Sequence, residues 1–212
     1  MRKSVCRLIA IFAVAVVPLS VQAETVSVVE GGQTSVLFGN GALESLGLAI
    51  AGVDGDVVAP GELGPFSVAF PINARDAAML PTTFEYDGTD FAPFAGTIEH
   101  MGEVELTDAA TSTASITVGD FTIGYDAARV DGDATGFFVQ DNVDTGAILF
   151  DIANPIVEAF DTVLVIAADI LVSSELSGLL NEQGLIDFDA TGADAGMALV
   201  VADASVIPVP AA

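Results

Sequence analysis

Residues 96–106 read GTIEHMGEVEL, a run in which apolar and polar side chains alternate. Ile98, Val104 and Leu106 are apolar, and all three lie at even positions. Successive side chains of a β-strand point to opposite faces of the sheet, so strict alternation is typical of a strand with one buried face. The stretch therefore predicts a half-buried strand.

Similar short segments, rich in β-branched residues and bounded by glycine, proline or aspartate, run through the rest of the chain. The further strands that we expect cover residues 25–29, 35–38, 66–70, 114–118, 121–125, 136–140, 147–152 and 162–171. Gly31-Gly32 predicts a turn between the first two, and Gly119-Asp120 predicts a hairpin connection. Short helices are expected over residues 41–46 and 174–181, the second with Ser173 as its N-cap. The pattern predicts an all-β fold, sandwich or barrel-like and mainly antiparallel, with two short helices.

The first 23 residues have a different character. Arg2, Lys3 and Arg7 precede an apolar run over residues 8–17, and Val21-Gln22-Ala23 offers small residues where a signal peptidase reads. This run is shorter than the roughly 20 apolar residues of a membrane-spanning helix. We expect residues 1–23 to be a signal peptide handled by the Sec export machinery and signal peptidase, with an uncleaved anchor as the alternative. The protein is then secreted or held at the cell surface.

After this segment, the sequence indicates one β-rich extracellular domain over residues 24–203. A proline-rich tail is expected over residues 204–212, because proline cannot donate to a strand ladder. Cys6 is the single cysteine and lies in the signal segment, so the domain has neither a disulfide nor thiol chemistry.

The charge balance excludes one class of partner. The chain has 30 acidic residues and five lysines and arginines, of which only Arg75 and Arg129 follow the signal segment. Nucleic-acid binding needs a basic surface, so nucleic acid is excluded as a partner. The acidity favours adaptation to a saline habitat, and attraction of divalent cations or of a basic partner stays open.

Candidate catalytic and metal-binding residues are few. His100 is the only histidine, and the chain has no Gly-x-Ser-x-Gly, Ser-x-x-Lys or His-Glu-x-x-His motif, so we expect no enzymatic activity. His100 is interpreted as a structural residue of a sheet, with a ligand-binding role as the alternative. Asp187, Asp189 and Asp194 surround a glycine and are the best candidates for a calcium loop, although such sequences also form simple turns. No other cofactor is expected.

The last residues, IPVPAA at 207–212, resemble the sorting signals of bacterial exosortase substrates, the PEP-CTERM-type proteins. Pro208, Pro210 and Ala211 match the Val-Pro-x-Pro-Ala version of the motif, which an apolar helix and an arginine cluster follow in that family. The segments 80–100 and 118–126 are similar to secreted domains that carry this signal. The resemblance implies a surface or matrix location, with an exosortase-like transpeptidase and extracellular polysaccharide as partners.

A second resemblance concerns residues 96–102, which are similar to a Gly-x-Ile-x-His-x-Gly-like strand of surface haem-binding domains from iron-uptake systems. Those domains hold haem through a tyrosine supported by a histidine, which here would be Tyr86 or Tyr125 with His100. Two functions therefore remain open. One is an exported, non-catalytic surface or extracellular-matrix protein, and the alternative is a secreted or periplasmic binding protein for a small apolar ligand such as haem or lipid.

Overall fold

A computed structural model describes residues 25–38, 42–111, 113–160 and 162–208. The strands of this part of the chain are β1 (Thr25–Leu37), β2 (Leu48–Asp54), β3 (Val68–Pro71), β4 (Glu85–Asp87), β5 (Phe91–Ala95), β6 (Ile98–Glu99), β7 (Glu103–Asp108), β8 (Ser115–Gly119), β9 (Thr122–Asp131), β10 (Ala134–Gln140), β11 (Ile148–Ala159), β12 (Val163–Val172) and β13 (Asp194–Pro208). The helices are α1 (Ala42–Ser45) and α2 (Ser174–Glu182). The expected all-β, antiparallel class with two short helices is confirmed.

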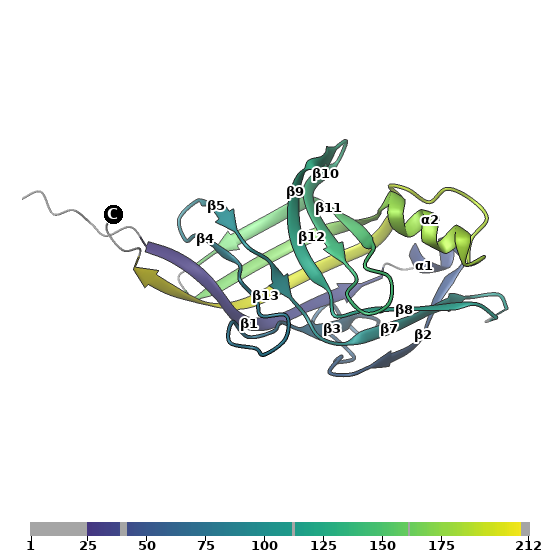
Figure 1. Ribbon diagram of the computed structural model, residues 1–212, viewed down its shortest axis with the longest axis horizontal. Coiled ribbons are helices and arrows are strands. Elements are labelled where there is room, and N and C mark those ends of the chain that lie inside the picture. The colour runs from purple at the N-terminus through teal and green to yellow at the C-terminus, as the bar shows by residue number, and fades with distance from the viewer. Residues whose placement is uncertain (1–24, 39–41, 112, 161, 209–212) are drawn as a thin grey trace, which may run out of the picture.

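A curled main sheet dominates the molecule (Figure 1). Its strand order is β5-β4-β1-β13-β12-β11-β10-β9-β6, and β3 pairs with the far end of β1. The strands from β9 to β13 follow one another as an antiparallel meander, and β1 then adds beside β13. Of the strands that precede β9 in the chain, β4 and β3 pair with β1, whereas β6 pairs with β9 at the other edge of the sheet.

The curl brings the two edges of the main sheet together. The amides of Thr83 and Phe84 both donate to the carbonyl oxygen of Thr97, at 2.9 and 3.0 Å, just before β4 and β6. Val29 of β1 in turn donates to the carbonyl of Phe84 at 3.0 Å. These bonds satisfy backbone groups that an open edge would leave unpaired. The result is a half-barrel with an apolar concave face.

A second, three-stranded sheet has the order β2-β7-β8. The chain passes into it from the main sheet at Gly102, which has φ +106°. A Cβ at this residue would lie 2.6 Å from Cγ2 of Val57. Residues 96–106, expected to form one strand, are therefore divided between β6 and β7. Ile98 of β6 and Val104 of β7 are both buried, as the pattern predicts. Glu99 beside Ile98 is buried as well, so the alternation holds over residues 103–106 of β7 and not in β6.

The prediction of a hairpin at Gly119-Asp120 is also wrong, because the chain crosses between the two sheets at this point. β8 pairs with β7 in the small sheet, whereas β9 pairs with β10 and β6 in the main sheet. Asp120 has a positive φ of 44° at the crossing point. A short Gly-Asp connection can turn a chain between two sheets as well as between two paired strands.

The turn expected at Gly31-Gly32 is also wrong, since β1 is continuous through it. The register with β13 shifts between Val29 and Gly31, which is a β-bulge. Gly32 has φ +118°, and a Cβ there would lie 2.3 Å from the carbonyl oxygen of Val201. The two glycines therefore bend a long strand and let the neighbouring backbone approach closely.

The C-terminal strand was not expected from the sequence. Residues 204–208, assigned there to a tail, are the end of β13, which pairs with the start of β1 in the register Thr25↔Pro208. Pro208 is tolerated because it lies at the strand end, where a missing N–H group disrupts no ladder. The signal segment 1–23 and the motif residues Pro210 and Ala211 lie outside the described residues.

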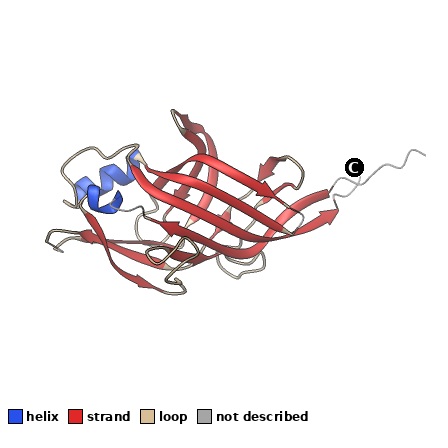
Figure 2. Ribbon diagram, turned by 180° about the vertical axis from the view of Figure 1, so that it is seen from behind, coloured by secondary structure: helices blue, strands red, loops and turns tan. Residues whose placement is uncertain are grey.

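The two helices lie at the end of the molecule far from the end of β13 (Figure 2). The predicted N-cap of α2 is confirmed, because Ser173 Oγ accepts from the amide of Leu176 at 2.9 Å. Leu176 and Leu180 pack into the core beneath the helix. Among the described residues, no helix is both long and apolar enough to cross a membrane.

One ion-pair network ties α2 to the main sheet. Arg129 of β9 bonds Asp151 of β11 through Nε at 2.7 Å and Glu175 of α2 through Nη1 at 2.7 Å. The hydrogen bond from Arg129 lowers the pKa of Glu175 to about 2. Arg129 is therefore fully engaged by carboxylates and is unavailable to an anionic ligand.

The two sheets are joined by the buried carboxylate of Asp141, directly after β10. Its Oδ1 accepts from the amide of Gly119, the last residue of β8, at 2.8 Å. Its Oδ2 accepts from the amide and the hydroxyl of Thr145, both at 2.7 Å. Burial raises the pKa of Asp141, but hydrogen bonds from Thr145, Gly119 and Val143 outweigh it and hold the pKa below its ordinary value of 3.8.

We predict that Asp141→Asn lowers the free energy of unfolding by about 2 kcal/mol at neutral pH, because an amide cannot accept all of these bonds and places its own donors against them. Urea unfolding measures the difference. A group with a lowered folded pKa stabilises the fold above its unfolded pKa and loses that effect as the pH falls. The difference in free energy of unfolding between the native protein and Asp141→Asn should therefore become smaller below pH 3.8.

Asp144→Asn is the matched control, since Asp144 is exposed in the same loop. It should leave the free energy of unfolding nearly unchanged. Equal losses in the two variants would show that Asp141 does not join the sheets.

Candidate functional site

The concave face of the main sheet encloses a cavity of about 290 Å³. Inward-facing residues of the strands line it, as in β12, where Ile166, Ala168 and Ile170 face the cavity and the intervening residues face away. Phe70 of β3 and Phe150 of β11 contribute from other strands. The cavity is therefore built from the same alternation that produces the sheet.

Aromatic rings cover one side of the cavity. The β4–β5 hairpin carries Phe91 and Phe94, and Phe94 reaches Phe137 of β10 with 4.9 Å between ring centroids. Phe84 also stacks on Phe94, with 6.1 Å between ring centroids. These contacts join the β5 edge of the sheet to β10 without a strand ladder. Side-chain packing, rather than hydrogen bonding, thus closes this part of the half-barrel.

The residues that line the cavity differ in exposure. Phe94, Phe137 and Val157 on its lining are half-buried, whereas Ile98 and His100 are fully buried. We refer to the part of the lining formed by Phe94, Phe137 and Val157 as the mouth. A ligand entering at the mouth would meet aromatic and aliphatic carbon before it reached the buried side.

A bulge in β11 places proline on the lining. The register with β12 shifts between Ala153 and Ile156, around Asn154 (φ +48°) and Pro155. Proline is tolerated inside this sheet because the bulge removes the ladder bond that its missing N–H would have made. Pro155 lines the cavity at this bulge.

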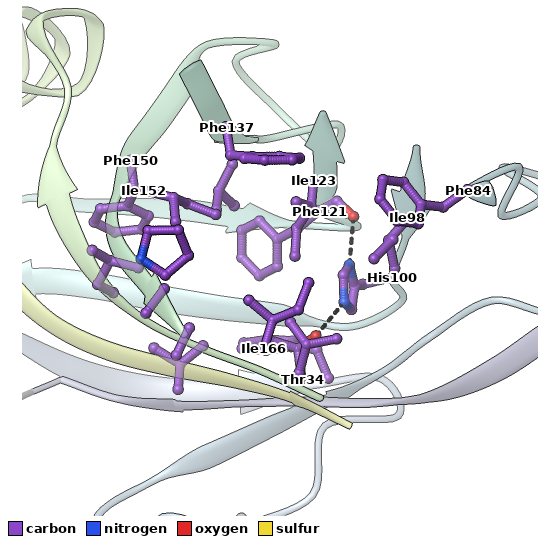
Figure 3. A pocket seen from close by; sticks show the side chains of 18 of the residues that line it. Thr34, Phe84, Ile98, His100, Phe121, Ile123, Phe137, Phe150, Ile152 and Ile166 are labelled. Atoms are coloured by element: carbon purple, nitrogen blue, oxygen red, sulfur yellow. Dashed lines mark hydrogen bonds between the residues drawn. The ribbon is translucent and has the colours of Figure 1, made fainter. Parts of the chain in front are cut away.

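Two polar side chains, Thr34 of β1 and His100, lie on the buried side (Figure 3). His100 Nδ1 lies 3.0 Å from the carbonyl oxygen of Phe121, and Nε2 lies 2.7 Å from Thr34 Oγ1. A carbonyl oxygen can only accept, so Nδ1 carries the proton and Nε2 accepts from the threonine hydroxyl. The pair satisfies itself, and the inner surface of the cavity is almost entirely carbon.

Burial fixes the charge of His100 as well as its tautomer. Its side chain is 1% exposed. Loss of solvation lowers its pKa from 6.5 to about 4, although the hydrogen bond to Phe121 works in the opposite direction. The imidazole is therefore neutral at physiological pH, and no positive charge lines the buried side.

The structure brings only some of the predicted site residues to this cavity. His100 lines it, whereas the two tyrosines do not. Tyr86 is buried elsewhere and donates to the carbonyl of Phe160 at 3.1 Å, and Tyr125 is 44% exposed against the outer edges of Phe94 and Phe137. A tyrosine beside His100 is thus not found among the described residues.

The predicted calcium loop is not gathered into a metal site. Asp189 Oδ1 accepts from Ser177 Oγ and from the amide of Thr191, and Asp194 Oδ1 accepts from the amide of Gly196. These carboxylates close local turns instead of converging with Asp187. Within the part of the chain that the structure describes, no group of three or more histidine, cysteine, aspartate or glutamate residues could hold a metal ion.

Sequence reasoning missed Thr34, the partner of His100. The two residues are 66 positions apart, and Thr34 stands in a segment with no recognisable motif. Only the pairing register of β1 with its neighbouring strands places the Thr34 hydroxyl at the cavity.

Comparison with solved structures identifies a related architecture. The haem-binding protein HtaB from Corynebacterium glutamicum superposes with a TM-score of 0.54 at 12% sequence identity, over 88% of this chain and 100% of that chain. The chain shares its fold with HtaB. The C-terminal domain of HtaA from the same organism gives a TM-score of 0.48 at 14% identity, over 85% of this chain and 99% of that chain. No protein-family model and no curated protein matches the sequence. At this identity the similarity to HtaB concerns the fold alone.

The single histidine allows a direct test of the site. Between pH 6.5 and about 4 the unfolded chain takes up a proton at His100 and the folded protein does not, so stability falls as the pH falls through this window. The loss attributable to His100 should approach about 3 kcal/mol at the lower end. Glutamine cannot titrate, so the free energy of unfolding of His100→Gln should fall less between pH 6.5 and about 4 than that of the native protein. Urea unfolding of both proteins measures the two losses.

The NMR signal of the His100 ring gives an independent check, because no other histidine overlaps it. Its chemical shift should stay constant from pH 8 down to about 5. A titration midpoint near 6.5 would show that the imidazole is solvated and that the cavity is open to water at this point.

Proposed function

We propose that this protein is an exported, non-catalytic binding protein that takes a small apolar ligand into the cavity of its main sheet. The observation that carries the proposal is the cavity itself, about 290 Å³ of space on an interior surface of carbon with a half-buried mouth. Well-packed interiors seldom leave voids larger than a water molecule. Ligand pockets, in contrast, begin at roughly 300 Å³ and are mainly apolar.

The comparison supports the same class of function. HtaB, which shares this fold, is named as a haem-binding protein, and haem is a largely apolar ligand. The signal segment 1–23 supports export, so binding would take place outside the cytoplasm. A purely structural role at the surface or in the matrix, the other expectation from the sequence, would not need an enclosed cavity.

The residues around the cavity do not fit haem itself. Neither described tyrosine lines the cavity, and both ring nitrogens of His100 are already hydrogen-bonded. The two carboxylates of haem would also meet no cation, because Arg75 and Arg129 do not line the cavity. Arg75 donates to the carbonyl of Phe84, and Arg129 is held by two carboxylates. The proposal therefore concerns apolar ligands of other kinds.

The first test fills the cavity. Ala168 is buried on β12 and faces the cavity, so Ala168→Phe should occupy the space that a ligand needs. N-Phenylnaphthylamine, a probe that fluoresces in apolar surroundings, should bind the native protein saturably at one site. We expect Ala168→Phe to abolish this signal while the protein still unfolds cooperatively in urea.

Ala167→Phe is the matched control, because Ala167 does not line the cavity and faces the opposite side of β12. This variant should bind the probe as the native protein does. Absence of saturable probe binding to the native protein would refute the proposed function. Haem forms a second arm, in which a Soret shift that is lost in His100→Ala would identify haem as the ligand against our expectation.

A further inference from the structure

The hydrogen bonds of the polar pair restrict which part of a ligand can occupy the buried side of the cavity. Thr34 donates its only hydroxyl proton to His100 Nε2, and His100 donates its only ring proton to Phe121. Neither group has a proton left for a ligand. The hydroxyl oxygen of Thr34 could still accept a hydrogen bond, but the polar atoms of the pair expose almost no surface in the cavity, whose lining is carbon. A polar group pushed into the buried side would lose its water and gain nothing in exchange.

Charge restricts the other end of the ligand. The chain carries 30 acidic residues, and both arginines of the described part are engaged elsewhere. Glu99 and Asp141 are the only described acidic residues that are buried, so the remaining described carboxylates contribute a negative field at the surface. A negatively charged head group at the mouth would be repelled and would find no cation.

The size of the cavity adds a third restriction. At about 290 Å³ it lies at the lower end of the range for ligand pockets, so it suits one slim chain better than a broad ring system. Its lining of phenylalanine, isoleucine and valine side chains offers contacts along such a chain and few directional ones.

Resting on the proposed function, we propose that the ligand is a single-chain lipid without a negatively charged head group. Its hydrocarbon end lies against Thr34 and His100, and its head group stays at the mouth. The ligand class follows from the carbon lining, the self-satisfied polar pair and the absence of a cation. This occupant differs from haem in shape, in charge and in needing no metal ligand.

Three ten-carbon compounds test the two ends of the ligand separately, each by displacement of N-phenylnaphthylamine from the native protein. Decanol carries one uncharged head. Decanoate has the same chain with a negative head, and decanediol has a second hydroxyl at the end that would be buried. We expect decanol to bind most tightly. Decanediol should bind about tenfold more weakly or worse, because its second hydroxyl is buried unpaired. Decanoate should bind at least about threefold more weakly at low salt, with a gap that closes as salt is added.

Variants of β1 show whether the buried end of the ligand meets the polar pair. Thr34→Ala removes the hydroxyl and leaves His100 Nε2 as an unpaired acceptor beside new space, so the second hydroxyl of decanediol can donate to it. The difference in affinity between decanol and decanediol should fall to about threefold or less. Val36→Ala, on the same strand and also on the lining, enlarges the cavity without adding a polar atom and should leave the gap unchanged.

The outcomes separate this inference from the proposed function. Probe binding that all three compounds displace equally would overturn the inference and leave the proposed function standing. The inference would also fail if decanoate bound more tightly than decanol, or if Thr34→Ala and Val36→Ala changed the decanediol gap by the same amount. If the probe itself did not bind, both would fail.

Discussion

The pairing of β1 with β13 is the interaction on which the rest of the structure depends. It runs from Thr25↔Pro208 to Leu37↔Met197 and joins the N-terminal part of the chain to the C-terminal meander. β4 and β3 pair with the other edge of β1. Without this ladder, β4, β5 and β3 would have no sheet to join. The concave face would then be exposed to water, and an apolar face of this size is stable only when it is covered.

Closure of the sheet has a chemical consequence. A surface that becomes the interior of a half-barrel must either be apolar or satisfy its polar groups internally. The main sheet does both, since phenylalanine and aliphatic side chains fill the concave face and the Thr34–His100 pair bonds to itself and to Phe121. Neutral His100 is thus part of the wall, with both ring nitrogens committed to hydrogen bonds inside the fold.

The acidic surface and the apolar interior are kept separate with few exceptions. Glu99 and Asp141 are buried, and both accept hydrogen bonds. Thr122 donates to Glu99, and the amides of Gly119 and Thr145 donate to Asp141. Arg129 is committed to joining β9, β11 and α2. The protein therefore has an uncharged interior inside a negative shell, and under the proposed function this arrangement would favour neutral apolar compounds over acidic ones.

Local patterns in the sequence determined the β class, the approximate position of many strands and the helix after Ser173, because alternation and capping depend only on near neighbours. The sequence did not reveal that residues 96–106 divide between two sheets, that Gly31-Gly32 bends a strand instead of ending it, or that β13 exists. Each of these depends on a partner strand distant in the chain. The cavity and the Thr34–His100 pair were likewise decided only by the tertiary structure, since long-range register, which local propensity does not encode, sets which side chains meet across a curled sheet.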